Sequence, residues 1–224
     1  MRRFLGLNAL SLVFFGLFLL AATGEAIAGH AEYNQQQLAS GLDRISYGRY
    51  LASSHFMVAI LENWQSEFLQ FFLYIWATVW LVQKGSAESK EPGDEGRGTD
   101  EEQLVGEHAG PDAPALARRS GVAHKLFEHS LLVVFGVIFL LSWGAQAVTG
   151  WVAFNEEQLR QLQHTDTFWS YLGGADFWSR TFENWQSEFL AVGTMCVFSI
   201  WLRERGSPES KRVGDPHAKT GSDV

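Results

Sequence analysis

The octapeptide ENWQSEFL occurs twice in this 224-residue chain, at residues 62–69 and again at residues 183–190. Each copy leads directly into an apolar run. The constant shift that superimposes the two copies also aligns Asn34 with Asn155, among other identities. Self-similarity at a fixed shift is the signature of a repeated structural unit. The sequence therefore predicts an internal duplication, and the fold must be built from two similar halves.

Apolar residues are concentrated in four runs that are nearly free of charge: residues 4–28, 68–82, 130–148 and 189–202. A helix needs about twenty residues to cross a hydrocarbon core of about 30 Å. The first and third runs reach this length, whereas the second and fourth reach it only with the ENWQSE residues that precede them. We therefore expect an all-α protein with four transmembrane helices, arranged as two helical hairpins. Because each hairpin would enter the membrane in the same orientation, the repeats should be parallel, with a pseudo-twofold axis along the membrane normal.

The first run permits a second interpretation. Arg2 and Arg3 precede an apolar stretch, and Ala26-Ile27-Ala28 resembles a signal-peptide cleavage site. The equivalent run at residues 130–148 is internal and cannot be a removable leader. Because a duplicated unit should use both copies in the same way, we expect an uncleaved helix.

Basic residues predict the orientation of these helices. With a cytoplasmic N-terminus, the outer segments would hold only Arg44, Arg49, Arg160 and Arg180, and every other lysine and arginine would lie inside. An excess of basic residues near the inner ends of helices is the positive-inside pattern. We therefore expect a multi-pass protein of the bacterial cytoplasmic (inner) membrane with both termini in the cytoplasm.

Composition divides the chain into four parts. We expect a first repeat at residues 1–86, a disordered acidic cytoplasmic linker at 87–122, a second repeat at 123–207 and a flexible cytoplasmic tail at 208–224. The linker is rich in Gly, Pro and acids and lacks hydrophobic periodicity. GSAESK at residues 85–90 recurs as GSPESK at 206–211, and its glycine is typical of a helix stop.

The repeated octapeptide supplies the candidate site. Its polar side chains form a candidate cluster between the repeats: Glu62, Asn63, Gln65, Glu67, Glu183, Asn184, Gln186 and Glu188. On a helix, Asn63 and Glu67 share a face at spacing i,i+4. If the helix spans the membrane, Glu67 should lie about 8 Å inside the outer boundary. A carboxylate at that depth normally faces a bundle interior or a water-filled cavity.

Two interpretations of these residues remain open. In the first, the polar side chains hydrogen-bond between helices, while tryptophans anchor the membrane interfaces. The expected anchors are Trp64, Trp80, Trp185 and Trp201. In the second, Glu67 and Glu188, with Glu62 and Glu183, form an acidic site that moves an ion, a proton or a small solute. Arg180 is the nearest basic candidate partner in the sequence.

The sequence gives little support for an enzymatic function. None of the seven histidines repeats at the shift, and HExxH, GxSxG and phosphate-binding loop patterns are absent. Cys196 is the only cysteine, which excludes an intrachain disulfide and a multi-cysteine metal site. We therefore expect no catalytic residue, metal or cofactor. The expected partner is the lipid bilayer, with a second copy of the chain or another membrane protein as further candidates, and no nucleic acid.

The chain resembles an uncharacterised bacterial family of small, internally duplicated integral membrane proteins, a domain of unknown function. The resemblance rests on ENWQSEFL, on NEEQL at residues 155–159 and on GSPESK, and it covers nearly the whole chain except the acidic linker. The first half departs from it with NQQQL at residues 34–38. This resemblance implies a membrane architecture and a bacterial origin, but no activity or ligand. We therefore expect a non-enzymatic structural or envelope-associated role, with ion, proton or small-solute translocation as the alternative.

Overall fold

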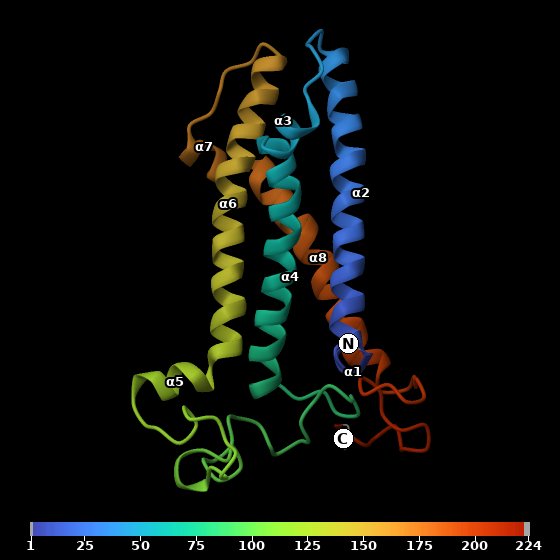
Figure 1. Cartoon of the computed structure of the whole chain (residues 1–224), viewed down its shortest axis with the longest axis vertical. Coiled ribbons are helices and arrows are strands. Elements are labelled where there is room, and N and C mark those ends of the chain that lie inside the picture. The colour runs from blue at the N-terminus through green and yellow to red at the C-terminus, as the bar shows by residue number, and fades with distance from the viewer. Residues whose placement is uncertain (1, 222–224) are drawn as a thin grey trace. The chain divides into compact units, whose positions relative to one another are not determined.

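A computed structural model describes residues 2–221 and shows only helices, turns and loops over that range (Figure 1). The prediction of an all-α fold is confirmed for these residues. The helices are α1 (Arg2–Leu7), α2 (Ala9–Ala39), α3 (Tyr47–Leu51), α4 (Ser54–Trp80), η1 (Gly106–His108), α5 (Val122–Glu128), α6 (Ser130–Arg160), α7 (Phe168–Gly173) and α8 (Ala175–Phe198).

Two helices in the described range, not four, are both long and apolar enough to be candidate membrane spans. These are α2 and α6, each of 31 residues. Of the four expected spans, two are supported by this measure, and spanning by α4 and α8 stays a prediction. The octapeptide ENWQSEFL lies inside α4 and α8, as the lengths of their apolar runs required. Both helices are long enough to cross, but the polar octapeptide lowers the apolarity of each.

The chain divides into two compact units, which we describe separately. The elbow unit comprises Met1–Leu61 and Ala145–Phe177, and the belt unit comprises Glu62–Gly144 and Trp178–Val224. The elbow unit takes its name from the two segments that follow α2 and α6, residues 40–53 and 161–174. The belt unit contains both copies of ENWQSEFL.

An asparagine clamps each elbow onto the helix before it. The Asn34 side chain accepts a hydrogen bond from the Ile45 amide at 2.8 Å and donates to the Ile45 carbonyl at 3.1 Å. Asn155 makes the same pair of bonds with Asp166, at 2.8 and 2.9 Å. Both partners lie at equivalent positions of the two sequence copies. The aligned asparagines therefore perform the same structural task.

The residue one turn before each asparagine contacts the same carbonyl although its type differs. His30 Nε2 lies 2.9 Å from the Ile45 carbonyl oxygen, and Trp151 Nε1 donates to the Asp166 carbonyl at 2.7 Å. Histidine and tryptophan both present a ring nitrogen at the required reach. His30 and Trp151 therefore differ in type but place a ring nitrogen against the equivalent carbonyl in each copy.

A buried tyrosine packs against a glycine in each half of the elbow unit. The Tyr50 hydroxyl lies against Gly29 and the Tyr171 hydroxyl against Gly150, so close that a Cβ on either glycine would clash with it. Tyr50 and Tyr171 are both buried. The glycines therefore act as notches in α2 and α6 that admit a tyrosine hydroxyl.

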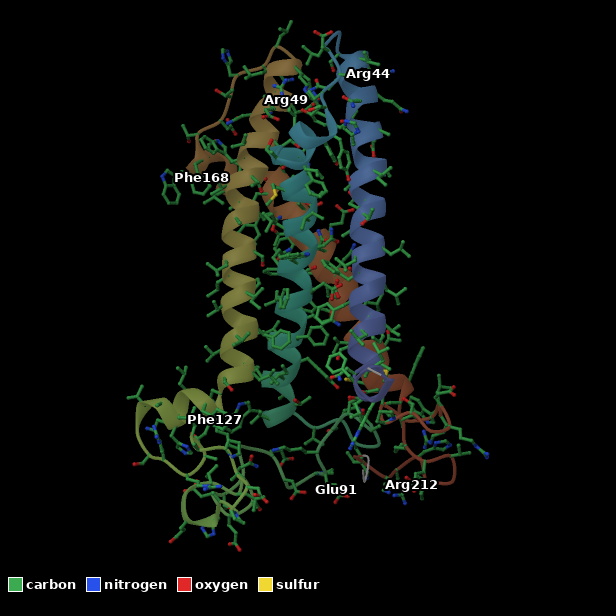
Figure 2. The ribbon with its side chains drawn as sticks, in the orientation of Figure 1. Arg44, Arg49, Glu91, Phe127, Phe168 and Arg212 are labelled. Atoms are coloured by element: carbon green, nitrogen blue, oxygen red, sulfur yellow. The ribbon has the colours of Figure 1, made fainter. Side chains whose placement is uncertain are left out.

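Further polar contacts join α6 to α2 and α4 within the elbow unit. Arg160 donates to the Tyr33 hydroxyl at 2.7 Å, and its guanidinium lies 5.1 Å from the centre of the Tyr33 ring. Ser54 donates to Glu156 at 3.1 Å. Figure 2 shows Arg44 and Arg49 in the first elbow and Phe168 in the second. The helices of this unit are thus fastened at their elbow ends by side-chain hydrogen bonds.

The glycine notch gives a stability prediction with a control on the same helix. Gly150→Ala places a methyl group against the Tyr171 hydroxyl, and overpacking of this kind costs about 1–3 kcal/mol. Gly144→Ala, also in α6, has open space around the added carbon. We expect Gly150→Ala to lower the unfolding midpoint of the detergent-solubilised protein and Gly144→Ala not to lower it. Equal midpoints for the two variants would contradict the notch.

Candidate functional site

The candidate site is a polar belt on α4 and α8 within the belt unit. We define the polar belt as residues 62–67 of α4 and residues 180–188 of α8. Because the octapeptide lies inside continuous helices, its polar side chains project at helical spacing instead of forming a loop. Each side chain must therefore find a partner on a neighbouring helix, on its own backbone or in solvent.

Gln65 forms the best-buried contact of the polar belt. Its side chain is fully buried, its carbonyl oxygen accepts a hydrogen bond from the Trp185 indole at 2.8 Å, and its amide nitrogen donates to the Glu62 carbonyl at 3.0 Å. The indole has a single N–H donor, so this bond satisfies it. One octapeptide copy thus supplies the acceptor and the other supplies the donor.

Glu62 and Arg180 form the charged contact of the polar belt, with 3.4 Å between the guanidinium and the carboxylate. The arginine side chain is 42% exposed and the glutamate side chain 20% exposed. A pair this exposed is worth less than about 1 kcal/mol. Arg180 was the nearest basic candidate in the sequence, but its partner here is the acid of the other copy.

The acids Glu67 and Glu188 approach each other in the polar belt. Glu188 is half-buried, and it lies within range of Ser66 and of the charge on Glu67. Ser66 is itself buried and donates to the Asn63 carbonyl at 2.9 Å. Acids at equivalent positions of the two copies therefore lie within electrostatic range of each other, and a shared acidic site stays a prediction.

The remaining predicted site residues are exposed or bond to the backbone of their own helix. Glu183 and Gln186 are exposed, as is Asn63, while the Asn184 side chain donates to the Arg180 carbonyl of its own helix at 2.9 Å. Three of the four tryptophans expected as interface anchors are exposed: Trp64, Trp80 and Trp201. The fourth, Trp185, is half-buried. Anchoring by those three stays a prediction.

The second octapeptide copy packs against a large aromatic ring of α6. The Trp143 ring of α6 stacks on Phe139 and lies 6.1 Å from the Trp185 ring and 6.1 Å from the Trp178 ring, centre to centre. The position equivalent to Trp143 in the first half is an alanine, Ala22. A second large ring therefore supports Trp185 beside Gln65. No corresponding ring is available from that position to the first copy.

The GSAESK and GSPESK loops, also in the belt unit, repeat one hydrogen-bond pattern. Ser89 Oγ accepts from the Gln83 amide at 2.9 Å, and Ser210 Oγ accepts from the Glu204 amide at 3.0 Å. Each serine then donates to the carbonyl of the lysine that follows it. The two loops therefore share one turn structure in the segments that follow α4 and α8.

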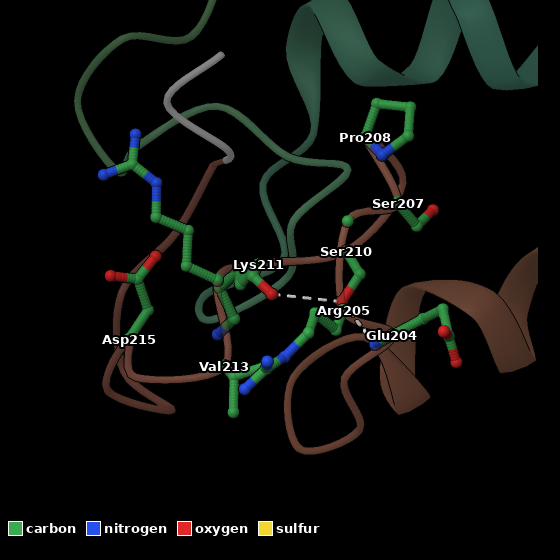
Figure 3. A pocket seen from close by; sticks show the side chains of 10 residues that line it. Glu204, Arg205, Ser207, Pro208, Ser210, Lys211, Val213 and Asp215 are labelled. Atoms are coloured by element: carbon green, nitrogen blue, oxygen red, sulfur yellow. Dashed lines mark hydrogen bonds between the residues drawn. The ribbon is translucent and has the colours of Figure 1, made fainter.

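A cavity of about 460 Å³ opens at the second of these loops (Figure 3). Its lining includes Arg205, Ser207, Ser210 and Lys211. The basic and hydroxyl groups would suit an anion. However, Asp215 also lines the cavity and the Lys211 ammonium bonds to backbone carbonyls, so the free positive charge is small. Among residues 2–221, no group of three or more His, Cys, Asp or Glu side chains is arranged to hold a metal ion.

Sequence reasoning missed two groups of the belt unit. Thr181 is fully buried and its hydroxyl has no hydrogen-bond partner among the described residues, yet it lies just before the octapeptide and matches an isoleucine, Ile60, in the first half. Lys211 is also almost completely buried. The ESK sequence repeated in the two loops is the signal that points to Lys211, but by itself it predicts only that a helix ends nearby.

Comparison with known proteins gives one match. The family model described as "Domain of unknown function (DUF6766)" matches residues 1–222. Comparison with curated proteins and with solved structures gave no match. The resemblance found in the sequence is thus confirmed at the level of an uncharacterised family. Since the match covers almost the entire chain, the protein belongs to the family of the domain of unknown function DUF6766.

Proposed function

We propose that this protein is a multi-pass protein of the bacterial cytoplasmic membrane with a structural, non-enzymatic role in the cell envelope. The proposed membrane location is supported by α2 and α6, which are long and apolar enough to span a bilayer. In α2 the buried residues are Ala26, Tyr33, Asn34 and Gln37, and its apolar side chains are otherwise largely exposed. An apolar surface of this extent is unfavourable in water and favourable against lipid tails.

We further propose that α4 and α8 also cross, which gives four spans. They contain 27 and 24 residues, or about 40 and 36 Å at 1.5 Å per residue, against a hydrocarbon core of about 30 Å. Polar groups are tolerated at membrane depth when they face a bundle interior and pair with one another. The contacts between Gln65 and Trp185 and between Glu62 and Arg180 meet that requirement.

Internal duplication is part of the proposal. It is supported by equivalent hydrogen bonds at equivalent positions, in the asparagine clamps and in the serine bonds of the GSAESK and GSPESK loops. Two parallel hairpins related by a pseudo-twofold axis along the membrane normal are the arrangement that this duplication favours.

One observation carries the structural role: the hydrogen bond between the fully buried Gln65 and Trp185. A polar group used to fasten one helix to another is the ordinary function of glutamine within a membrane bundle. The lipid bilayer is the proposed partner, and a second copy of the chain or another membrane protein would bind through the exposed helix faces.

Translocation of a proton, ion or small solute is the second candidate function. The proximity of Glu67 to Glu188 favours it, because two carboxylates close together can share one proton. Against it stands the use of neighbouring polar groups in contacts between helices. We therefore rank translocation second.

The hydrogen bond of Gln65 is tested by the same substitution in both octapeptide copies. Gln65→Leu removes the acceptor of the Trp185 indole and should destabilise the protein by about 1 kcal/mol. Gln186→Leu changes an exposed glutamine in an identical local sequence. We expect the unfolding midpoint in detergent to fall only for Gln65→Leu. If both variants unfold at the wild-type midpoint, the polar belt does not fasten the helices.

The topology is tested with single cysteines in a Cys196→Ser background. Gln163→Cys places a thiol in the exposed second elbow, and Ser120→Cys places one in the exposed stretch before α5. We expect a membrane-impermeant maleimide to label intact cells only at position 163, and to label both positions after permeabilisation. Labelling of position 120 alone in intact cells would reverse the proposed orientation.

The two candidate functions differ in the effect of neutralising the facing acids. We expect Glu67→Gln combined with Glu188→Gln to insert normally and to leave the proton permeability of reconstituted vesicles unchanged. Empty vesicles and vesicles with the Glu183→Gln variant, whose acid is exposed, serve as controls. A proton flux present in the wild type and lost in the double variant would replace the structural role by translocation.

A further inference from the structure

Helix α5, in the belt unit, carries its apolar side chains on the outside of the protein. Val122, Ala123, Leu126 and Phe127 fall on one continuous side of the helix, because residues at spacing i,i+4 share a face. All four are exposed, Val122 by 85% and Leu126 by 56%. A helix on the surface of a soluble protein turns its apolar side toward the core. The apolar side of α5 points the opposite way.

The polar side of α5 faces the protein instead. The two ring nitrogens of His124 lie 2.9 Å from the Leu116 carbonyl oxygen and 3.1 Å from a carboxylate oxygen of Glu128. The His124 side chain is therefore largely buried. The segment that it contacts is folded by Arg118, which donates to the Ala113 carbonyl at 2.9 Å. These contacts fix the rotation of α5 and leave its apolar side uncovered by the described part of the chain.

Helix α5 lies across the end of α6, which is one of the two candidate membrane spans (Figure 1). Phe127 lies at the corner between the two helices (Figure 2), and only His129 separates them in the sequence. The apolar surface continues into the first turns of α6, where Leu131 and Val134 are exposed. A short amphipathic helix set crosswise at the end of a span is suited to the boundary between headgroups and acyl chains.

Basic side chains accompany the apolar side of α5. Residues 113–127 include three basic residues and no acid, in contrast to the acidic linker before them. Lys125 neighbours Val122 at spacing i,i+3, and Arg119 precedes the helix. Both basic side chains are exposed, and neither has an ion-pair partner among residues 2–221. Long basic side chains at a bilayer surface reach the headgroups, so this charge complements anionic lipids.

We propose that α5 is an interfacial helix that binds the surface of a bilayer containing anionic lipids. Val122, Leu126 and Phe127 insert below the headgroups, and Arg119 and Lys125 contact the headgroup phosphates. Apolar insertion gives affinity for any bilayer, and each basic side chain adds a preference of about fivefold for an anionic surface. This inference rests on the proposed membrane location of the chain and adds the site at which the chain binds lipid headgroups.

Fluorescent labels on the full-length protein test this interfacial helix. Leu126→Cys, in a Cys196→Ser background, is labelled with the environment-sensitive fluorophore NBD and reconstituted into vesicles of phosphatidylcholine and phosphatidylglycerol. Leu104→Cys is the matched control, because this leucine of the acidic linker is 63% exposed, close to the value for Leu126. We expect the label at position 126 to emit at a shorter wavelength than in water and to be quenched by lipids spin-labelled near the headgroup. The label at position 104 should emit as in water.

A third label separates this inference from the proposed membrane location. Leu140 lies in α6 and is exposed, so Leu140→Cys carries a label on the candidate span itself. We expect that label to be quenched by lipids spin-labelled deep in the acyl chains. A label in lipid at position 140 together with a label in water at position 126 would overturn the interfacial helix and leave the membrane location intact. Labels in water at both positions would overturn both.

The contact with anionic headgroups is tested by Arg119→Gln combined with Lys125→Gln in the protein labelled at position 126. We expect quenching by the headgroup spin label to fall in vesicles that contain phosphatidylglycerol. In vesicles of phosphatidylcholine alone it should stay at the level of the parent, because no anionic surface attracts the two cations. Arg97→Gln changes an exposed arginine of the acidic linker and should leave quenching unchanged in both. An equal fall in both kinds of vesicle, or no fall in either, would overturn this contact.

Discussion

The structure of the belt unit depends on one constraint: a glutamine inside a helix must find a partner when no water reaches it. Gln65 satisfies this constraint with the Trp185 indole and with the carbonyl of its own helix. The bond fixes how α4 and α8 face each other at this level. That alignment allows Glu62 to reach Arg180 and brings Glu67 near Glu188. The charged contacts are individually weak, so they follow the hydrogen bond and do not determine it.

In both units, polar side chains bond to backbone groups in the segments that follow the long helices. In the elbow unit, an asparagine closes each elbow by bonding both backbone groups of a single residue, and a ring nitrogen one turn away reinforces the same carbonyl. In the belt unit, a serine closes each GSxESK loop by accepting a backbone amide. Side chains therefore satisfy backbone groups where the helices end, and apolar packing fills the lengths between them.

Much of this arrangement could be predicted from the sequence, and the exceptions have physical causes. Apolar runs predicted α2 and α6, and the aligned Asn34 and Asn155 indicated equivalent tasks. However, the partners of the asparagines lie eleven residues away across a turn, where local patterns carry no information. The different burial of Gln65 and Gln186 could not be predicted either, because their local sequences are identical. It depends on which residues of the neighbouring helices surround each glutamine, and among those near Gln65 is Trp185, which Trp143 of α6 contacts.

The contact between Gln65 and Trp185 also bears on how the two halves depend on each other. Gln65 belongs to the first half, and the indole that satisfies it belongs to the second. A fragment consisting of the first half alone would contain Gln65 without the Trp185 indole that donates to it. Such a fragment would have to satisfy that glutamine with another donor, because the indole of Trp185 belongs to the second half. The contact therefore requires residues from both halves of the chain.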